Sequence, residues 1–256
     1  MPFTQVPGAS LYWKRDGRDD APALVLLNSI GTDMDLWDDV VRHLRDRFAL
    51  LRIDTRGHGA SAAEAGDFSL ARLADDVLAV ADDGGLGTFA LAGVSLGGMI
   101  GMELALRAPE RVTKLAPICT SATMDSAAWQ DRIVKVRGEG MAAIADLAMG
   151  RFLSDEAEPA IYETVRRQLL AMDAHGYAGC GAAIRDMDLA DRISGIACPV
   201  LVVTGTRDTS TPHEGHGEHL VSRIPNAAHN ALEAAHLAPL EAPQALAAAL
   251  TSFLES

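Results

Sequence analysis

A serine enclosed by glycines is the clearest candidate for chemistry in the sequence. The run Gly93–Gly97 has Ser95 at its centre, follows the apolar stretch Phe89–Ala92 and precedes residues with helical spacing. In a Gly-x-Ser-x-Gly turn between a strand and a helix, backbone strain lifts the serine hydroxyl clear of the sheet. Gly93 and Gly97 suit the close approach that follows, because they have no Cβ. The spacing predicts that Ser95 is a nucleophile.

A serine nucleophile needs a base to take its proton, and the base needs a carboxylate that fixes its tautomer. Asp208 follows the apolar run Pro199–Gly205, and His236 follows a last expected strand at Asn226–Glu233. Nucleophile, acid and histidine then occur in the chain order typical of this arrangement on an α/β sheet. We therefore predict a catalytic triad of Ser95, Asp208 and His236.

Six other residues compete for the roles of acid and base, and three of them lie on or near the helix expected before the last strand: His213, His216 and His219. Asp125 follows the strand after the serine turn and its helix, and is an alternative acid. His229 lies inside the expected last strand rather than after it, so we expect it to be a sheet residue. His58, in the glycine-rich loop Asp54–Ser61, could act as a base, but a tight turn tied by local hydrogen bonds explains it better. We leave His58 outside the catalytic set.

Two backbone N–H groups are needed to stabilise the oxyanion that serine attack creates. One belongs to the residue after the serine, Leu96. The other comes from the loop between a strand and the first helix, and Asn28–Thr32 follows the apolar run Ala23–Leu27 in this way. We assign the donors to Ile30 and Leu96. An ordinary loop with a helix-capping polar side chain fits the same residues.

The elements that must position these residues are apolar runs without alternating polar side chains, as expected for strands buried on both faces of a parallel sheet. Helical spacing occurs between them, for example over Ser69–Asp82 with Leu70, Leu73 and Val77 on one face. The sequence predicts an α/β fold with a mostly parallel sheet and helices on both faces. Ser10–Lys14 is the expected edge strand.

The alternation of strands and helices stops between residues 124 and 192, where the sequence becomes helical throughout. We expect an inserted helical cap at 124–192, and a core built from residues 1–123 and 193–256. Six arginines in this cap are candidates for binding an anionic ligand: Arg132, Arg137, Arg151, Arg166, Arg167 and Arg185. Solvated helix faces explain any one of them equally well.

Composition excludes other classes of function. The net charge of −13 argues against nucleic-acid or anionic-membrane partners, because both need a basic footprint. The apolar run Phe89–Leu106 contains four glycines and Glu103, so we interpret it as a strand and a helix rather than a membrane span. Three widely spaced cysteines and an N-terminus without an export signal predict a cytoplasmic protein.

The sequence predicts no metal and no cofactor. His213, His216 and His219 are three residues apart on an expected helix, yet no carboxylate or thiolate pattern completes a metal site. A phosphate-binding loop and a dinucleotide fingerprint are also absent from the sequence. We expect a small-molecule substrate, and the sequence makes no prediction of the oligomeric state.

With these residues in hand, the chain resembles the 3-oxoadipate enol-lactonases of the α/β-hydrolase superfamily over nearly its full length. The resemblance rests on these motifs: Leu27–Asp33 with Trp37, Asp54–Gly59, Gly93–Met99, Cys119–Ala122, Trp129 with Arg132, Gly176 and Tyr177 with Cys180, and Gly205–Pro212. It implies the α/β-hydrolase fold, no cofactor, and hydrolysis of the enol-lactone to 3-oxoadipate in bacterial breakdown of aromatic compounds. Two positions depart from the family: Phe152 replaces a tryptophan and His213 replaces a proline.

The implied substrate carries a carboxylate, which favours an arginine partner. We choose Arg132 for this contact, with Trp129 as an apolar wall. Two alternatives stay open. The same triad fits a promiscuous carboxylesterase that acts on neutral esters. A small-molecule receptor or signalling protein could also keep the fold and the triad but serve by binding.

Overall fold

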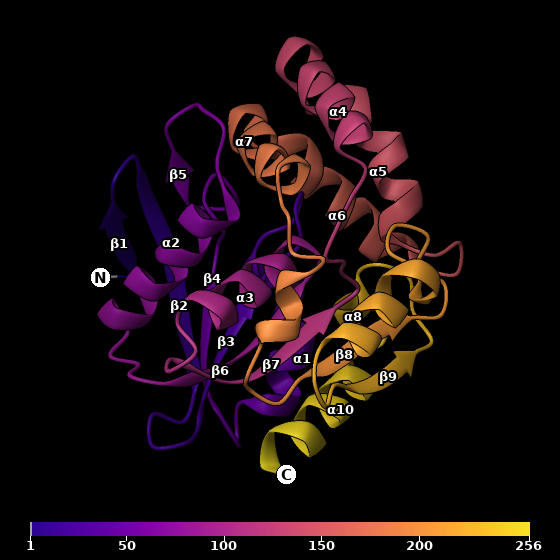
Figure 1. Cartoon of the computed structure of the whole chain (residues 1–256). Helices are drawn as coiled ribbons and strands as arrows, with labels where there is room; N and C mark the ends of the chain where they lie inside the picture. The colour runs from indigo at the N-terminus through magenta and orange to yellow at the C-terminus, as the bar shows by residue number, and fades with distance from the viewer. Residues whose placement is uncertain (1) are drawn as a thin grey trace.

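A computed structural model describes residues 2–256, which form one sheet of nine strands (Figure 1). The strand order is β1-β2-β4-β3-β6-β7-β8-β9, with β5 paired to β2. All pairs from β4 to β9 are parallel, whereas β2 runs antiparallel to β1, β4 and β5. The strands are β1 (Phe3–Val6), β2 (Ala9–Gly17), β3 (Ala23–Leu27), β4 (Ala49–Ile53), β5 (Ala62–Ala63), β6 (Phe89–Val94), β7 (Val112–Ile118), β8 (Leu201–Gly205) and β9 (Ala228–Leu232).

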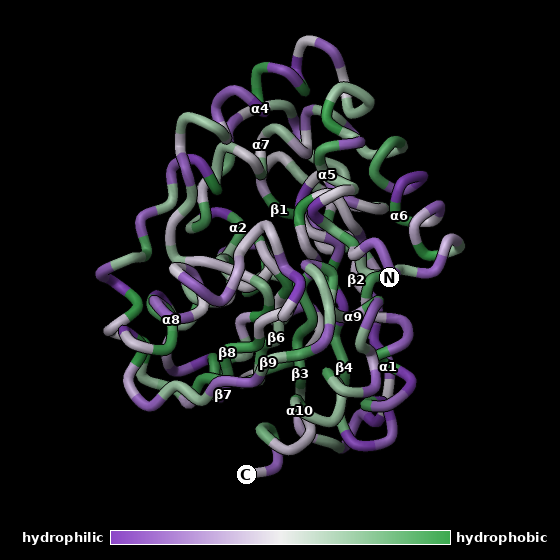
Figure 2. The backbone as a smooth tube through the Cα atoms, turned by 90° about the vertical axis from the view of Figure 1, so that its right-hand side faces the viewer, coloured by the Kyte–Doolittle hydropathy of each residue, from purple (hydrophilic) through white to green (hydrophobic). Residues whose placement is uncertain are grey.

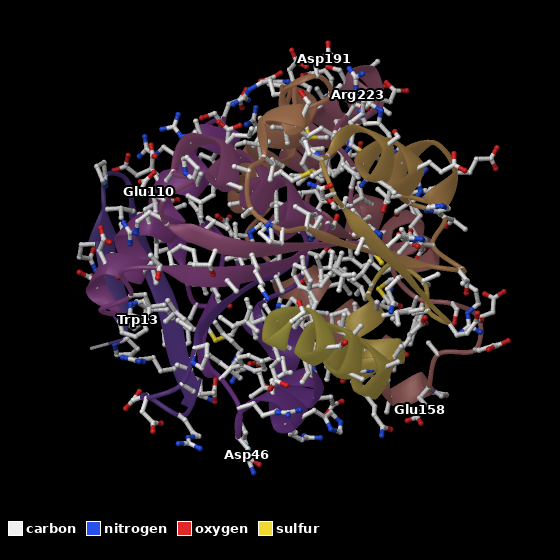
Figure 3. All side chains as sticks on the ribbon, turned by 60° about the horizontal axis from the view of Figure 1, so that its bottom comes forward. Trp13, Asp46, Glu110, Glu158, Asp191 and Arg223 are labelled. Atoms are coloured by element: carbon white, nitrogen blue, oxygen red, sulfur yellow. The ribbon has the colours of Figure 1, made fainter. Side chains whose placement is uncertain are left out.

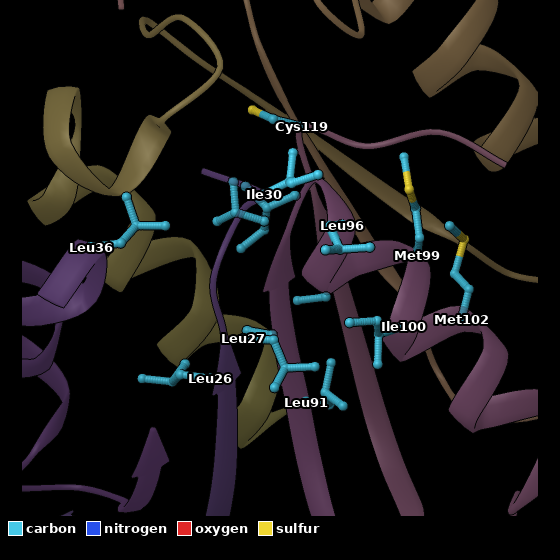
Figure 4. Packing of buried hydrophobic residues seen from close by; sticks show 14 of the residues in the cluster. Leu26, Leu27, Ile30, Leu36, Leu91, Leu96, Met99, Ile100, Met102 and Cys119 are labelled. Carbon is cyan, nitrogen blue, oxygen red and sulfur yellow. The ribbon is translucent and has the colours of Figure 1, made fainter. Parts of the chain in front are cut away.

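The central strands consist mostly of apolar residues and are buried on both faces. Every residue of β4, β6 and β8 is buried, and Figure 2 shows hydrophobic residues running along β3 and β4. In Figure 4, Leu27 of β3 and Leu91 of β6 point toward Ile100 on the neighbouring helix. Burying one such side chain contributes about 1.5–3 kcal/mol. The mostly parallel sheet predicted from these runs is confirmed.

The expectation that Ser10–Lys14 forms an edge strand is wrong. These residues belong to β2, which lies between β1 and β4, and β1 is the edge. The indole N–H of Trp13 donates to the hydroxyl of Thr4 at 3.0 Å and so ties the two strands together. On its other side, β2 contacts β4, where Asp16 pairs with the buried Arg52.

Helices cover both faces of the sheet. Figure 3 shows the sheet between two layers, with Asp191 and Arg223 on one side and Asp46 on the other. The helices are α1 (Asp38–Leu44), α2 (Leu70–Asp83), α3 (Leu96–Arg107), α4 (Ser126–Glu139), α5 (Ala145–Phe152), α6 (Pro159–Ala171), α7 (Ala174–Arg185), α8 (Glu218–Arg223), α9 (Ala238–Glu241) and α10 (Pro243–Glu255), with short 3-10 turns η1 (Met34–Trp37), η2 (Met141–Ile144) and η3 (Arg192–Gly195), and the kinked turn η4 (His213–Gly217).

Helices α4 to α7 come between β7 and β8 and lie beyond one end of the sheet (Figure 1). We call residues 124–192 the cap segment. Helices α4 and α7 pack closely, because a Cβ on Gly181 would lie only 3.1 Å from Ile133. The cap segment also reaches the core, where Gly176 lies against Gly57 with no room for a Cβ on either. The division into a cap domain at 124–192 and a core domain stays a prediction.

Among the helices of residues 2–256, none combines the length and the apolar character that a bilayer crossing requires.

Candidate active site

Ser95 lies in a sharp turn between β6 and α3, with φ of 53° and ψ of −114°. A residue with a side chain adopts positive φ only when the surrounding structure enforces it. Here the Ser95 N–H donates to the Ile118 carbonyl at 2.9 Å, and the Ser95 carbonyl accepts from the Thr120 hydroxyl at 2.7 Å. A Cβ on Gly93 would lie 2.3 Å from the Gly97 backbone. The crowding expected from the two glycines is therefore present.

Asp208 and His236 are in direct contact. The Asp208 Oδ2 atom lies 2.9 Å from His236 Nδ1, and both side chains are buried. The same carboxylate accepts hydrogen bonds from the backbone N–H groups of Ser210 and Thr211 and from the Thr211 hydroxyl. Burial alone would raise the pKa of Asp208, but His236 and these donors lower it to about 2. The carboxylate is thus ionised at neutral pH and can orient and stabilise the imidazole.

The loop that carries His236 turns inward from β9 across the ends of β8 and β7. A Cβ on Gly205, the last residue of β8, would lie 2.4 Å from the Ala234 carbonyl. The Cys119 thiol, just after β7, lies 3.8 Å from the Ala235 carbonyl. Since β7 is the neighbour of β6, this path leads His236 toward the end of the sheet where Ser95 lies.

Ile30 and Leu96, the residues whose N–H groups are the candidate donors, lie at the same end of the sheet (Figure 4). A Cβ on Gly97 would lie 2.7 Å from the Leu27 carbonyl, so the serine turn touches the start of the loop Asn28–Thr32. Leu96 is the first residue of α3, where an N–H has no intrahelical acceptor. Within residues 2–256, neither N–H has a hydrogen-bond acceptor, which leaves both free to bind an oxyanion.

The segment Asp54–His58 holds this loop in place through side chains. The Asn28 Oδ1 atom accepts from Thr55 N–H at 3.1 Å and from its hydroxyl at 2.7 Å. The Asp54 carboxylate accepts from Met34 N–H at 2.8 Å. The loop is therefore fixed at both of its ends.

His58 binds the middle of the loop. Its Nε2 atom accepts from Gly31 N–H at 3.2 Å, and its Nδ1 atom lies 3.1 Å from the Arg56 carbonyl, which accepts only if Nδ1 carries the proton. Burial lowers the pKa of His58 to about 4, so the imidazole is neutral at physiological pH. The exclusion of His58 from the catalytic set stays a prediction, and its side chain contacts the loop Asn28–Thr32 as well as its own turn.

Trp129 and Arg132 lie together on α4. The Arg132 guanidinium carbon is 4.5 Å from the centroid of the buried Trp129 ring. Burial raises the pKa of Tyr177 on α7, and the positive charge of Arg132 opposes this effect. The buried Tyr177 hydroxyl has no hydrogen-bond partner within residues 2–256. An unpaired buried hydroxyl is costly, so an acceptor on a bound ligand would stabilise it.

The seven arginines of the cap segment divide into two groups. Arg137 pairs with Asp67, Arg185 pairs with Asp67 and Asp186, and Arg192 pairs with Glu103. In the described part of the chain, the remaining four arginines have no ion pair: Arg132, Arg151, Arg166 and Arg167. Arg132 differs from the last three because its guanidinium is stacked on a buried aromatic ring.

The competing candidates have other contacts. Asp125 caps α4 by accepting from Ala127 and Ala128 N–H. His229 is within β9, as expected, and stacks on His213 with ring centroids 4.3 Å apart.

The expectation that His213, His216 and His219 share one helix is wrong. Glu214 and Gly215 have non-helical backbone angles, so the chain kinks between the first histidine and the other two. His216 Nδ1 lies 2.8 Å from the Ser121 hydroxyl, and His219 Nε2 lies 3.1 Å from the Ala190 carbonyl. Across residues 2–256, no three His, Cys, Asp or Glu side chains are grouped so as to hold a metal ion.

The sequence alone predicts no role for Tyr177, Asn28 or Glu241. Tyr177 and Asn28 belong to motifs that carry the family resemblance, which is the one signal that could have identified them. Glu241 lies in α9, where its contacts with residues 154 and 235 are invisible in the sequence.

Comparisons with known proteins agree with this geometry. The family described as alpha/beta hydrolase fold matches residues 22–243. The chain is 34% identical to 3-oxoadipate enol-lactonase 2 of Acinetobacter baylyi over 92% of this chain and 90% of that protein. It is 29% identical to a pimeloyl-[acyl-carrier protein] methyl ester esterase of Nitrosomonas europaea, over 86% of this chain and 89% of that protein.

A solved structure gives the same result. The enol-lactonase from Burkholderia xenovorans LB400 is 34% identical and matches with a TM-score of 0.96, with 100% of both chains covered. The resemblance and the α/β-hydrolase fold predicted from the sequence are therefore confirmed. Given the serine turn, the Asp208–His236 contact and these matches, the chain belongs to the α/β hydrolase family and is a hydrolase similar to enol-lactonases.

Proposed function

We propose that the chain hydrolyses the enol-lactone of 3-oxoadipate to 3-oxoadipate, with Ser95, His236 and Asp208 as its catalytic triad. The observation that carries the proposal is the buried 2.9 Å contact between Asp208 and His236 at the end of the sheet where the strained Ser95 turn lies. The names of the relatives supply the substrate class.

In the first half of the reaction, His236 takes the Ser95 proton as the serine oxygen attacks the lactone carbonyl. The N–H groups of Ile30 and Leu96 stabilise the oxyanion, and loss of one such donor costs on the order of 10²–10³ in rate. Ring opening then breaks the bond between the acyl carbon and the enol oxygen, which takes the proton from His236, and the enol tautomerises to a ketone. In the second half, His236 takes a proton from water as the water attacks the acyl carbon, and returns it to the Ser95 oxygen as the acid leaves.

The substrate carboxylate binds Arg132 in this proposal. Arg132 has no carboxylate partner within residues 2–256, and its stacking on Trp129 holds the guanidinium in one orientation. The Tyr177 hydroxyl, which has no partner in the same part of the chain, is a neighbouring donor. The cationic site favours an anionic lactone over a neutral ester.

A carboxylesterase is the second candidate, because the methyl ester esterase of Nitrosomonas europaea is 29% identical over most of both chains. Such an enzyme would use the same triad on esters without a carboxylate. Its kcat/KM would then show no preference for the charged lactone.

The test is a spectrophotometric assay of the purified protein with the enol-lactone and with p-nitrophenyl acetate. We expect turnover of both substrates, with kcat/KM at least 10-fold higher for the lactone, since a charge-assisted hydrogen bond contributes about 1.5–3 kcal/mol. Ser95→Ala should abolish both activities, and the exposed control Ser222→Ala should keep them. Full activity of Ser95→Ala would overturn the proposal, and very slow turnover of both substrates by the unaltered protein would favour a receptor.

A further inference from the structure

The loop that carries His236 is held by a hydrogen bond on each side of the histidine. Leu237 N–H donates to the Phe152 carbonyl at 3.0 Å. On the other side, Ala235 N–H donates to Glu241 Oε2 at 2.6 Å. The two residues next to His236 are thus fixed by groups outside the Asp208 contact.

Glu241 joins this loop to the cap segment through its two carboxylate oxygens. While Oε2 accepts from Ala235, Oε1 accepts from Ser154 N–H at 2.7 Å and from the Ser154 hydroxyl at 2.9 Å. Hydrogen bonds to an ionised carboxylate are roughly twice as strong as neutral ones. A single side chain therefore holds residue 154 of the cap segment and residue 235 of the histidine loop at a fixed separation.

The imidazole itself also contacts the cap segment. The Phe152 ring stacks on His236, with ring centroids 6.1 Å apart and planes inclined by 13°. The Phe152 side chain is buried, so the two rings cannot move independently without opening the core. Asp208 fixes one nitrogen of the imidazole, and Phe152 limits the rotation of its plane.

We infer that Phe152, Ser154 and Glu241 form a cap-to-base clamp, in which Glu241 is a positioning residue that orients His236 according to the position of the cap segment. The inference rests on the proposed role of His236 as the base. The clamp makes proton transfer from Ser95 depend on the cap being seated. Displacement of a catalytic group by about 1 Å can cost on the order of 10²-fold in rate.

A second link between the cap segment and the core provides a matched control. Glu156 pairs with Arg207, the residue before Asp208, but the two side chains are 76% and 35% exposed. An ion pair in water contributes little to holding a loop. Glu156→Gln therefore removes an exposed cap-to-core carboxylate contact that does not involve the backbone N–H groups next to His236.

The test compares Glu241→Ala and Glu241→Gln with Glu156→Gln in the full-length protein. One measurement is kcat and KM for p-nitrophenyl acetate. The other is the rate at which a small fluorophosphonate labels the serine, a step in which the Ser95 oxygen bonds to phosphorus, fluoride leaves and His236 takes the proton. We expect Glu241→Ala to lower kcat and the labelling rate about 10- to 100-fold, with KM within about 2-fold.

Glu241→Gln keeps one acceptor oxygen and should lose about 3- to 10-fold, as expected if the contacts act one by one. Glu156→Gln should match the unaltered protein. Unaltered kcat and labelling in a folded Glu241→Ala would overturn the clamp, as would a change confined to KM. If Glu241→Ala does not fold, Glu241→Gln decides between the same outcomes.

Failure of the proposed function would give different results from failure of the clamp. Lack of lactone turnover by the unaltered protein would overturn the substrate, while serine labelling would still test the clamp. Full activity of Ser95→Ala would overturn the triad, and the clamp with it.

Discussion

The His58 Nε2 atom accepts a hydrogen bond from Gly31 N–H at 3.2 Å, which joins a buried imidazole to the residue after the proposed oxyanion donor Ile30. Gly31 has φ of +84°, a conformation in which a side chain would be strained. The bond fixes the peptide plane that follows Ile30. A histidine outside the proposed triad thus helps to shape the proposed oxyanion site.

Replacing His58 by phenylalanine should lower both stability and kcat. The ring is kept, but Gly31 N–H loses its buried acceptor, at a cost of about 1–3 kcal/mol, while the Arg56 carbonyl keeps the Cys180 thiol as a donor. We expect the free energy of unfolding in urea to fall by that order and kcat for p-nitrophenyl acetate to fall about 10-fold or more, with KM little changed. An unaltered kcat in a folded variant would show that the loop needs no support from this side.

Asp208→Asn should keep the fold and lose activity. The amide can still bond to His236, but it favours the wrong tautomer and cannot stabilise the charged imidazole. We expect kcat to fall on the order of 10³–10⁴-fold with a small change in KM. The control is Asp125→Asn, which removes the competing candidate acid at the start of α4. A larger loss in that control than in Asp208→Asn would reverse the assignment.

Arg132→Ala should raise KM for the enol-lactone about 10-fold or more and leave kcat/KM for p-nitrophenyl acetate within about 2-fold, since only the lactone carries a carboxylate. Arg137→Ala is the matched control, because Arg137 lies on the same helix but pairs with Asp67. Equal effects of Arg132→Ala on both substrates would contradict the proposed contact.

Two buried carboxylates should give stability a maximum in mildly acidic solution. Burial raises the pKa of Asp54 to about 6, so its ionisation opposes folding above that pH, and stability should rise as the pH falls from about 6 to about 4. Asp208 has a pKa lowered to about 2 by its partners, so the stability it contributes is full above about 4 and is lost as the pH falls toward 2. Each effect amounts to about 2–3 kcal/mol.

Urea unfolding of Asp54→Asn at pH 7, 5 and 4 separates the two effects. The variant should lose the rise in stability between pH 6 and pH 4, whereas the exposed control Asp46→Asn should keep it. If the free energy of unfolding of Asp54→Asn still rises between pH 6 and pH 4, another group causes the rise.

Local patterns predicted the central strands and the serine turn because their causes lie within a few residues. The run Phe89–Val94 is apolar throughout and forms β6 at those bounds. The chain order of Asp208 and His236 was enough to predict their contact. The neighbours of β2 were not predictable in this way, since its pairing with Phe3–Val6 and with β4 depends on contacts between distant segments.

The same limit applies to the supports of the site. His58 and Glu241 act through hydrogen bonds to residues 27 and 87 positions away in the chain. Nothing near either residue in the sequence indicates its partner. The residues that support the candidate site can therefore be identified only from the structure. The candidate nucleophile, acid and base can be identified from the spacing of residues and their order in the sequence.

The close packing around Gly31 limits how the cap segment can be exchanged between related enzymes. A Cβ at this position would lie 3.1 Å from both Phe152 and Leu169 of the cap segment. The loop Asn28–Thr32 and the cap segment therefore pack closely against each other at Gly31. A larger ring at position 152, such as the tryptophan of the enol-lactonase pattern, would press on that loop. A chimaera that takes its cap segment from another family member should therefore take residues 28–32 from the same member.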